Sequence, residues 1–299
     1  MEAEDIKKVV VLGAGVMGHG IAMTCARNGI GTMMVDVSKD TLEQAYDQMR
    51  NGRFGLTKLV EKGKMTKEDM ESLISKIGAT TDIEEAAENA DLIIEAIAED
   101  LELKKKVWKQ YDKICSERTI FASNTSTIMI TEQAAATDRP DRFIGMHWFN
   151  PAQIMKLIEV IRGALTSTET FNVTIDFSRK LGKNPLEAKD APGFFTSRFI
   201  SMVMNSAVRM FEEGIAGIEE IDTMCKQAFG FPMGPFELLD HTGLDVNVHS
   251  SDYIYGITGD PAAKAPVSLR KLAAAGYLGN KAMSKGGWYD YYQISKETT

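Results

Sequence analysis

Lys7-Lys8-Val9-Val10-Val11-Leu12-Gly13-Ala14-Gly15-Val16-Met17-Gly18 is an apolar run that passes without a gap into a glycine motif. Four consecutive apolar residues, Val9–Leu12, are typical of a strand that is buried on both faces. The residues after the glycines, His19 to Asn28, are compatible with a helix, and Thr32–Asp36 then predicts a second strand that ends in an acid. Strand, glycine turn, helix and strand form the context in which G-x-G-x-x-G indicates a dinucleotide-binding fold.

Each glycine of this motif has a physical reason. Gly13 permits a tight turn, Gly15 leaves room for a pyrophosphate, and Gly18 lets helix and strand pack closely. The amides at the helix N-terminus attract phosphate charge. Asp36 suits the adenine ribose hydroxyls and repels a 2'-phosphate, and no arginine follows it closely, so NAD is favoured over NADP. We therefore predict NAD as the cofactor, held by Gly13, Ala14, Gly15, Val16, Met17, Gly18 and Asp36; a purely structural glycine turn is the alternative.

The rest of the chain predicts two domains. Two helical segments, at about 39–62 and 66–77, predict a helical hairpin that projects from the sheet. Strands and helices then alternate up to Lys189, after which the sequence shows almost only helical periodicity. We predict an α/β fold in which a Rossmann-type doubly wound sheet domain, residues 1–189 with the hairpin at about 39–77, precedes an all-α domain, residues 190–299.

Two apolar runs, Phe143–Phe149 and Leu157–Ile161, predict a pair of strands joined by a bend that starts Asn-Pro. If the strands pair antiparallel about Gln153, His147 and Glu159 become direct cross-strand partners, with Cβ atoms ~5 Å apart. An imidazole beside a carboxylate can accept a proton near neutral pH. A buried histidine that only satisfies a hydrogen bond is the alternative, and the pair taken alone leaves both interpretations open.

Composition excludes several classes of protein. The chain has 299 residues, 44% of them hydrophobic, and a formal net charge of −8, which gives no general attraction for nucleic acid or acidic membranes. The three cysteines are isolated, as is typical of reduced thiols in the cytosol. The acidic N-terminus does not resemble a signal peptide, and no apolar stretch has the length of a membrane span. We expect a cytoplasmic protein without nucleic-acid or membrane partners and without a metal.

Further motifs follow one another in an order known from one enzyme family. With the glycine motif and Asp36, they make nearly the whole chain resemble the L-3-hydroxyacyl-CoA dehydrogenase family, including the bacterial 3-hydroxybutyryl-CoA dehydrogenases. The resemblance implies a Rossmann domain followed by a helical domain that forms a homodimer, and NAD-linked interconversion of (S)-3-hydroxyacyl-CoA and 3-ketoacyl-CoA. The motifs are Glu95-Ala96-Ile97, Ser123-Asn124-Thr125-Ser126, Gly145-Met146-His147-Trp148-Phe149-Asn150-Pro151, Ala191-Pro192-Gly193-Phe194 and Phe231-Pro232-Met233-Gly234-Pro235-Phe236-Glu237-Leu238-Leu239-Asp240.

The resemblance also implies roles for single residues. His147 would remove the C3 hydroxyl proton while Glu159 orients and supports the ring. Ser126 matches the hydroxyl that contacts both substrate and nicotinamide in the family. The positions that match cofactor contacts of the family are Glu99, Lys104, Asn150 and Lys281.

The chain departs from the family pattern at two places. Ser197 stands where well-known members carry asparagine; it can still donate a hydrogen bond, but it is shorter and lacks the second amide donor. We expect activity with altered positioning or acyl preference. In the predicted hairpin, Gly52 and Leu59 stand where some relatives place a serine and a lysine that touch CoA, so Arg53 and Lys58 are only nearby candidates for CoA binding.

Two other functions stay open at this point. A dehydrogenase of a free 3-hydroxy acid would keep the glycine motif and His147, although the basic residues of the predicted hairpin and the stretch Met146–Pro151 favour a thioester. A catalytically idle NAD-binding structural protein would not need Ser126, His147 and Glu159 together. Activity with an acyl-CoA compared with its free acid distinguishes the three.

Overall fold

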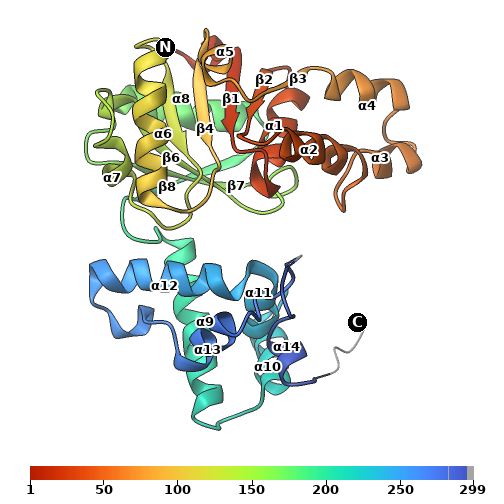
Figure 1. The fold of residues 1–299 in the computed structure, drawn as a ribbon, viewed down its shortest axis with the longest axis vertical. Helices are drawn as coiled ribbons and strands as arrows, with labels where there is room; N and C mark the ends of the chain where they lie inside the picture. The colour runs from red at the N-terminus through yellow and green to blue at the C-terminus, as the bar shows by residue number, and fades with distance from the viewer. Residues whose placement is uncertain (282, 295–299) are drawn as a thin grey trace. The chain divides into compact units, whose positions relative to one another are not determined.

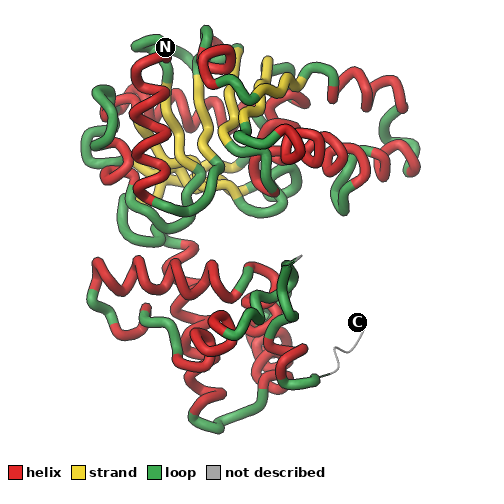
Figure 2. The backbone as a smooth tube through the Cα atoms, viewed as in Figure 1, coloured by secondary structure: helices red, strands yellow, loops and turns green. Residues whose placement is uncertain are grey.

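The computed structural model describes residues 1–281 and 283–294. The chain divides into two compact units, Met1–Asp190 and a second that begins at Ala191. Strands occur in the first unit, while the described part of the second unit is built of helices and the loops between them (Figures 1 and 2). The two architectures predicted from the sequence therefore occur in the predicted order.

An eight-stranded sheet forms the centre of the first unit, in the order β3-β2-β1-β4-β5-β6-β7-β8. Neighbouring strands run parallel except for β6 and β7, which pair antiparallel. Parallel strands need helical crossovers, which is why the apolar runs here alternate with helices. The strands are β1 (Lys8–Leu12), β2 (Gly31–Val35), β3 (Ile77–Thr80), β4 (Leu92–Glu95), β5 (Ile120–Ser123), β6 (Phe143–Trp148), β7 (Leu157–Arg162) and β8 (Asn184–Lys189).

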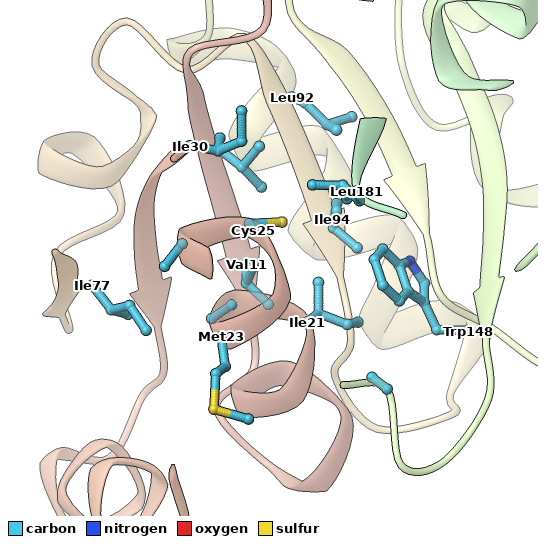
Figure 3. Close-up of a cluster of buried hydrophobic side chains, with 14 of the residues drawn as sticks. Val11, Ile21, Met23, Cys25, Ile30, Ile77, Leu92, Ile94, Trp148 and Leu181 are labelled. Carbon is cyan, nitrogen blue, oxygen red and sulfur yellow. The ribbon is translucent and has the colours of Figure 1, made fainter. Parts of the chain in front are cut away.

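Helices cover both faces of this sheet, as the prediction of a doubly wound sheet required. On one face, α1 (Val16–Arg27) and α8 (Thr168–Lys180) share a buried core with the strands; Figure 3 shows Ile21 and Cys25 of α1 close to Val11 and Ile94 of the sheet. On the other face, Trp108 of α6 (Leu101–Ile114) stacks on Phe121 at 5.1 Å and meets Phe143 edge-on at 4.8 Å. Short elements complete the unit: η1 (Ala3–Asp5), α5 (Ile83–Ala87), α7 (Ile130–Ala134) and η2 (Pro140–Arg142).

The region predicted as a two-helix hairpin contains three helices, α2 (Lys39–Asn51), α3 (Thr57–Glu61) and α4 (Lys67–Ile74). The chain breaks between α2 and α3 at Gly52 and Gly55, where a Cβ would lie only 2.5 Å from the carbonyl oxygens of Gln48 and Arg50. The second predicted segment also ends early, because Ile77 begins β3. This edge strand carries a single large apolar residue, so no period of two was visible in the sequence.

The second unit consists of helices packed around an aromatic core. Phe236 lies between Phe211 and Trp288, with ring centroids 5.8 and 4.9 Å away. At the start of this unit, Phe195 and Phe199 are 67% and 54% exposed and stack on each other. The elements are α9 (Thr196–Glu212), α10 (Ile218–Phe229), α11 (Pro235–Thr242), α12 (Leu244–Thr258), η3 (Pro261–Ala263), α13 (Val267–Ala274) and α14 (Trp288–Tyr291).

Across residues 1–281 and 283–294, no helix combines the length and apolar character that crossing a bilayer requires.

Candidate active site

A histidine and a glutamate face each other on the antiparallel strands β6 and β7. His147 pairs with Glu159 in the strand register, as the sequence predicted. The Nδ1 of His147 lies 2.7 Å from Oε2 of Glu159, and the two residues are 7% and 3% exposed. The neighbours of His147 in the strand, Met146 and Trp148, point into the core on the opposite face, since side chains alternate along a strand.

This contact determines which nitrogen of the ring donates and which accepts a hydrogen bond. A carboxylate accepts hydrogen bonds only, so Nδ1 donates to Glu159. A neutral imidazole with its proton on Nδ1 carries its acceptor lone pair on Nε2. The contact therefore fixes the orientation of the ring and makes Nε2 its hydrogen-bond acceptor.

The glycine motif at the end of β1 has the shape that a dinucleotide requires. A Cβ on Gly13, whose φ is +90°, would lie 2.6 Å from the carbonyl oxygen of Ala96, and a Cβ on Gly18 would lie 1.8 Å from the carbonyl oxygen of Gly13. A Cβ on Gly15 would meet no atom within 4 Å. Gly13 and Gly18 are thus required by the protein itself, while the space in front of Gly15 is open for a ligand.

The surroundings of this open space fit NAD. No side chain caps the N-terminus of α1, so its first amides can receive phosphate oxygens. Asp36 lies at the end of β2, where its Oδ2 accepts from the amide of Ala14 at 3.0 Å and its Oδ1 from the amide of Ser38 at 3.1 Å. Val16 and Val37 are 63% and 100% exposed.

Ser126 lies in the loop after β5 and is held there by Glu99. Glu99 Oε1 accepts from the amides of Ser126 at 3.0 Å and Thr127 at 3.2 Å, and from the hydroxyl of Thr125 at 2.5 Å. The hydroxyl of Ser126 itself lies 3.2 Å from that of Thr127. The Ser126 loop is next to the strand of His147, because β5 and β6 are neighbours in the sheet.

Lys104 is 1% exposed, and its Nζ contacts Glu95 at 2.5 Å and Glu99 at 3.2 Å. Its place in the first turn of α6 brings its ammonium group to the carboxyl end of β4 rather than into solvent. The cofactor contact that the family resemblance implies for Lys104 stays a prediction. Glu95, at the end of β4, was not singled out as a site residue, although it belongs to one of the family motifs.

The remaining predicted site residues are spread over several elements. Arg53 and Lys58 are both exposed, and Nζ of Lys58 donates to the carbonyl oxygen of Arg53 at 2.8 Å, so the two are neighbours where α2 turns into α3. Asn150 is exposed two residues after β6, and its peptide bond to Pro151 is cis. The other two, Ser197 in the first turn of α9 and Lys281, whose Nζ contacts Asp245 at 2.5 Å, belong to the second unit, and their roles stay predictions.

Comparison with known proteins covers nearly the whole chain. The family model described as 3-hydroxyacyl-CoA dehydrogenase, NAD binding domain, matches residues 8–191, and the one described as 3-hydroxyacyl-CoA dehydrogenase, C-terminal domain, matches residues 193–291. The chain is 42% identical to a probable 3-hydroxybutyryl-CoA dehydrogenase of Bacillus subtilis over 96% of its own length and 98% of the relative's. It is 40% identical to the human mitochondrial hydroxyacyl-coenzyme A dehydrogenase, over 96% and 91% of the two chains.

A solved structure of a protein with a similar name is also similar to this chain. The structure of (S)-3-hydroxybutyryl-CoA dehydrogenase from Ralstonia eutropha superposes with a TM-score of 0.87 at 38% sequence identity. The superposition covers 95% of this chain and 99% of that one. Both the strand-and-helix unit and the helical unit therefore have a counterpart of known structure.

Proposed function

This chain belongs to the 3-hydroxyacyl-CoA dehydrogenase family of NAD-dependent oxidoreductases, and we propose that His147 and Glu159 are the proton-transfer pair of its reaction. The reaction is the interconversion of (S)-3-hydroxyacyl-CoA and 3-ketoacyl-CoA. Bound NAD supplies the hydride acceptor. The observation that carries the proposal is the buried 2.7 Å contact between Nδ1 of His147 and Oε2 of Glu159.

His147 acts on the oxygen of C3. Its Nε2 takes the hydroxyl proton in the oxidation and returns it to the ketone oxygen in the reduction. Glu159 keeps Nδ1 protonated and compensates the positive charge of the ring. Ser126, fixed through its amide, offers a hydroxyl to the same oxygen, and Ser197 is proposed to do so from α9. The main chain of Gly13–Gly18, together with Asp36, holds the cofactor through amides and a carboxylate.

CoA recognition is proposed at the turn from α2 to α3. Arg53 and Lys58 are both exposed there, and their side chains carry two positive charges in a protein of net charge −8. Such local groups are needed because the overall field repels the phosphates of CoA. Loss of both charges is expected to raise KM for acyl-CoA and to leave NADH binding unchanged.

A homodimer through the helical unit and a cytoplasmic location are also proposed. Large apolar side chains are exposed on α9, α10 and the turn between them, a feature that marks protein interfaces. The three cysteines are all free, which suits a reducing compartment. Light scattering after size exclusion checks the dimer. The exposed side chains are Phe199, Met210, Ile215, Met224 and Phe229.

The test compares acetoacetyl-CoA with free acetoacetate as oxidants of NADH. We expect turnover with the thioester, little with the free acid, and a loss of at least about 10²-fold in kcat for His147→Gln, the lower end of what a positioned proton-transfer group contributes. Faster turnover of the free acid would favour the dehydrogenase of a 3-hydroxy acid. NADH binding without turnover of either compound would favour the idle structural protein.

A further inference from the structure

A fully buried carboxylate lies at the carboxyl end of β4, outside the set of residues assigned above. Glu95 is 0% exposed. Its Oε1 accepts from the amide of Ile97 at 2.8 Å and from Nζ of Lys104 at 2.5 Å, and its Oε2 accepts from the hydroxyl of Ser123 at 2.6 Å. One side chain thereby joins the loop after β4, the end of β5 and the first turn of α6.

Lys104 extends this contact to a second carboxylate. Burial alone would lower the pKa of Lys104, but the attraction of Glu95, and then that of Glu99, outweighs burial and raises it. Burial would raise the pKa of Glu99, and the charge of Lys104 with the hydrogen bonds from Thr125 and Ser126 lowers it instead. Lys104 is therefore a charged lysine fixed between two carboxylates.

The far end of this chain of contacts is Ser126. Glu99 uses Oε2 for Lys104 and Oε1 for the amides of Ser126 and Thr127 and the hydroxyl of Thr125. The hydroxyl of Ser123, which donates to Glu95, also accepts from the amide of Thr125 at 3.2 Å. Glu95 thus reaches the Ser126 loop by two routes, through Lys104 with Glu99 and through Ser123.

We propose that Glu95 is a positioning residue that fixes the Ser126 loop through Lys104 and Glu99; this inference rests on the proposed function of Ser126. Removing two ions from water is costly, and apolar residues of similar volume often replace buried pairs without loss of stability. A buried pair is therefore weak support for a purely stabilising role. Its directed bonds, in contrast, determine where Glu99 and the amide of Ser126 lie.

The variants separate position from stability. Glu95→Gln keeps the shape and removes the charge. The double variant Glu95→Leu/Lys104→Met removes both ions of the fully buried pair, so that neither is left without the other, while Glu99 keeps its hydrogen bonds from Thr125, Ser126 and Thr127. Arg118→Met is the control: Arg118 pairs with Asp91 at 2.6 Å just before β4 and β5, at the opposite ends of the same two strands. Each variant is measured for Tm, for kcat and KM with acetoacetyl-CoA, and for hydrogen exchange of the amides of Ser126 and Thr127.

For Glu95→Gln we expect kcat to fall about 10²-fold, the effect of displacing a reacting group by about 1 Å. KM should change less than about threefold, and the two amides should exchange faster. The double variant should have a Tm closer to that of the wild type than Glu95→Gln has, but its kcat should stay low and its two amides should still exchange fast. Arg118→Met should keep the wild-type kcat.

Two results would overturn the inference. One is a wild-type kcat and wild-type amide exchange in folded Glu95→Gln. The other is a double variant in which kcat returns together with Tm, because the pair would then be only structural. A wild-type protein that does not turn over acetoacetyl-CoA refutes the proposed function instead, and amide exchange then tests the positioning by Glu95 on its own.

Discussion

Replacing Glu159 by glutamine tests the proton-transfer pair with the smallest possible change. The amide has the size of the carboxylate, so β7 and its pairing with β6 stay as they are. Glutamine can donate a hydrogen bond to Nδ1, which favours the tautomer with its proton on Nε2. That tautomer cannot take a proton from the substrate. The substitution therefore removes both the fixed tautomer and the negative charge beside the ring.

The size of the effect follows from the contact distance. With Nδ1 and Oε2 2.7 Å apart, the centres of charge lie ~4 Å apart, and at an effective dielectric constant of ~20 their attraction is ~4 kcal/mol. A hydrogen bond to a charged group contributes ~1.5–3 kcal/mol by mutational measurement. Between these values, about 3–4 kcal/mol of transition-state stabilisation is lost. We expect kcat to fall about 10²–10³-fold, since each 1.36 kcal/mol is a factor of ten.

The assay follows NADH oxidation by acetoacetyl-CoA at saturating substrate. Glu187→Gln is the matched control: Glu187 lies on β8, next to β7 in the sheet, and is exposed. The control should keep the wild-type kcat, and Glu159→Gln should keep KM and NADH affinity within about threefold, because the interaction acts mainly in the transition state. A folded Glu159→Gln enzyme with a kcat within about threefold of wild type would refute the assigned role of Glu159.

Three further predictions concern the cofactor loop, a buried lysine and CoA. Gly15→Ala should leave Tm unchanged but weaken NADH binding about tenfold or more in a fluorescence titration, whereas Gly18→Ala should lower Tm as well, because its Cβ would overlap the carbonyl of Gly13. Burial, and then the charge of Lys156, lowers the pKa of Lys183 to about 8, below its unfolded value. The unfolded state therefore binds more protons between about pH 8 and 10, and the free energy of unfolding should rise with pH in that range. Urea denaturation should show this rise for the wild type and not for Lys183→Met. Arg53→Glu should raise KM for acetoacetyl-CoA about tenfold without changing kcat, if this exposed guanidinium contacts a phosphate; an unchanged KM would exclude it.

The parts of the fold predicted from the sequence are those in which local patterns were strong. The glycine motif with its flanking strands predicted β1, α1 and β2, and two apolar runs around one bend predicted the pairing of His147 with Glu159. Both predictions depend on spacing along a short segment. The prediction of one continuous helix over 39–62 was wrong, because the break between α2 and α3 depends on close backbone contacts at two glycines. The strand β3 was missed, because it lies at the edge of the sheet.

The surroundings of Ser126 could not be predicted in the same way. Glu95, Glu99 and Lys104 are all visible in the sequence, but their mutual contacts depend on how α6 packs against the ends of β4 and β5. A lysine in an amphipathic helix is usually solvated, and only the three-dimensional structure shows that Lys104 is buried between two carboxylates. The exposure of Phe195 and Phe199 could not be predicted either, because helical periodicity does not distinguish a helix face that packs in the core from one that is exposed.

The antiparallel order of β6 and β7 makes the enzyme sensitive to where the chain gains a residue. An inserted residue in the turn 150–156 lengthens the turn and leaves the register of the two strands unchanged. The same insertion between Leu157 and Glu159 shifts the register of β7 by one residue, so every side chain beyond it changes to the other face of the sheet. The carboxylate would then point into the apolar layer beside α1 and no longer face the imidazole, so we expect an insertion in the turn to be tolerated and one inside the strand to abolish the contact between His147 and Glu159.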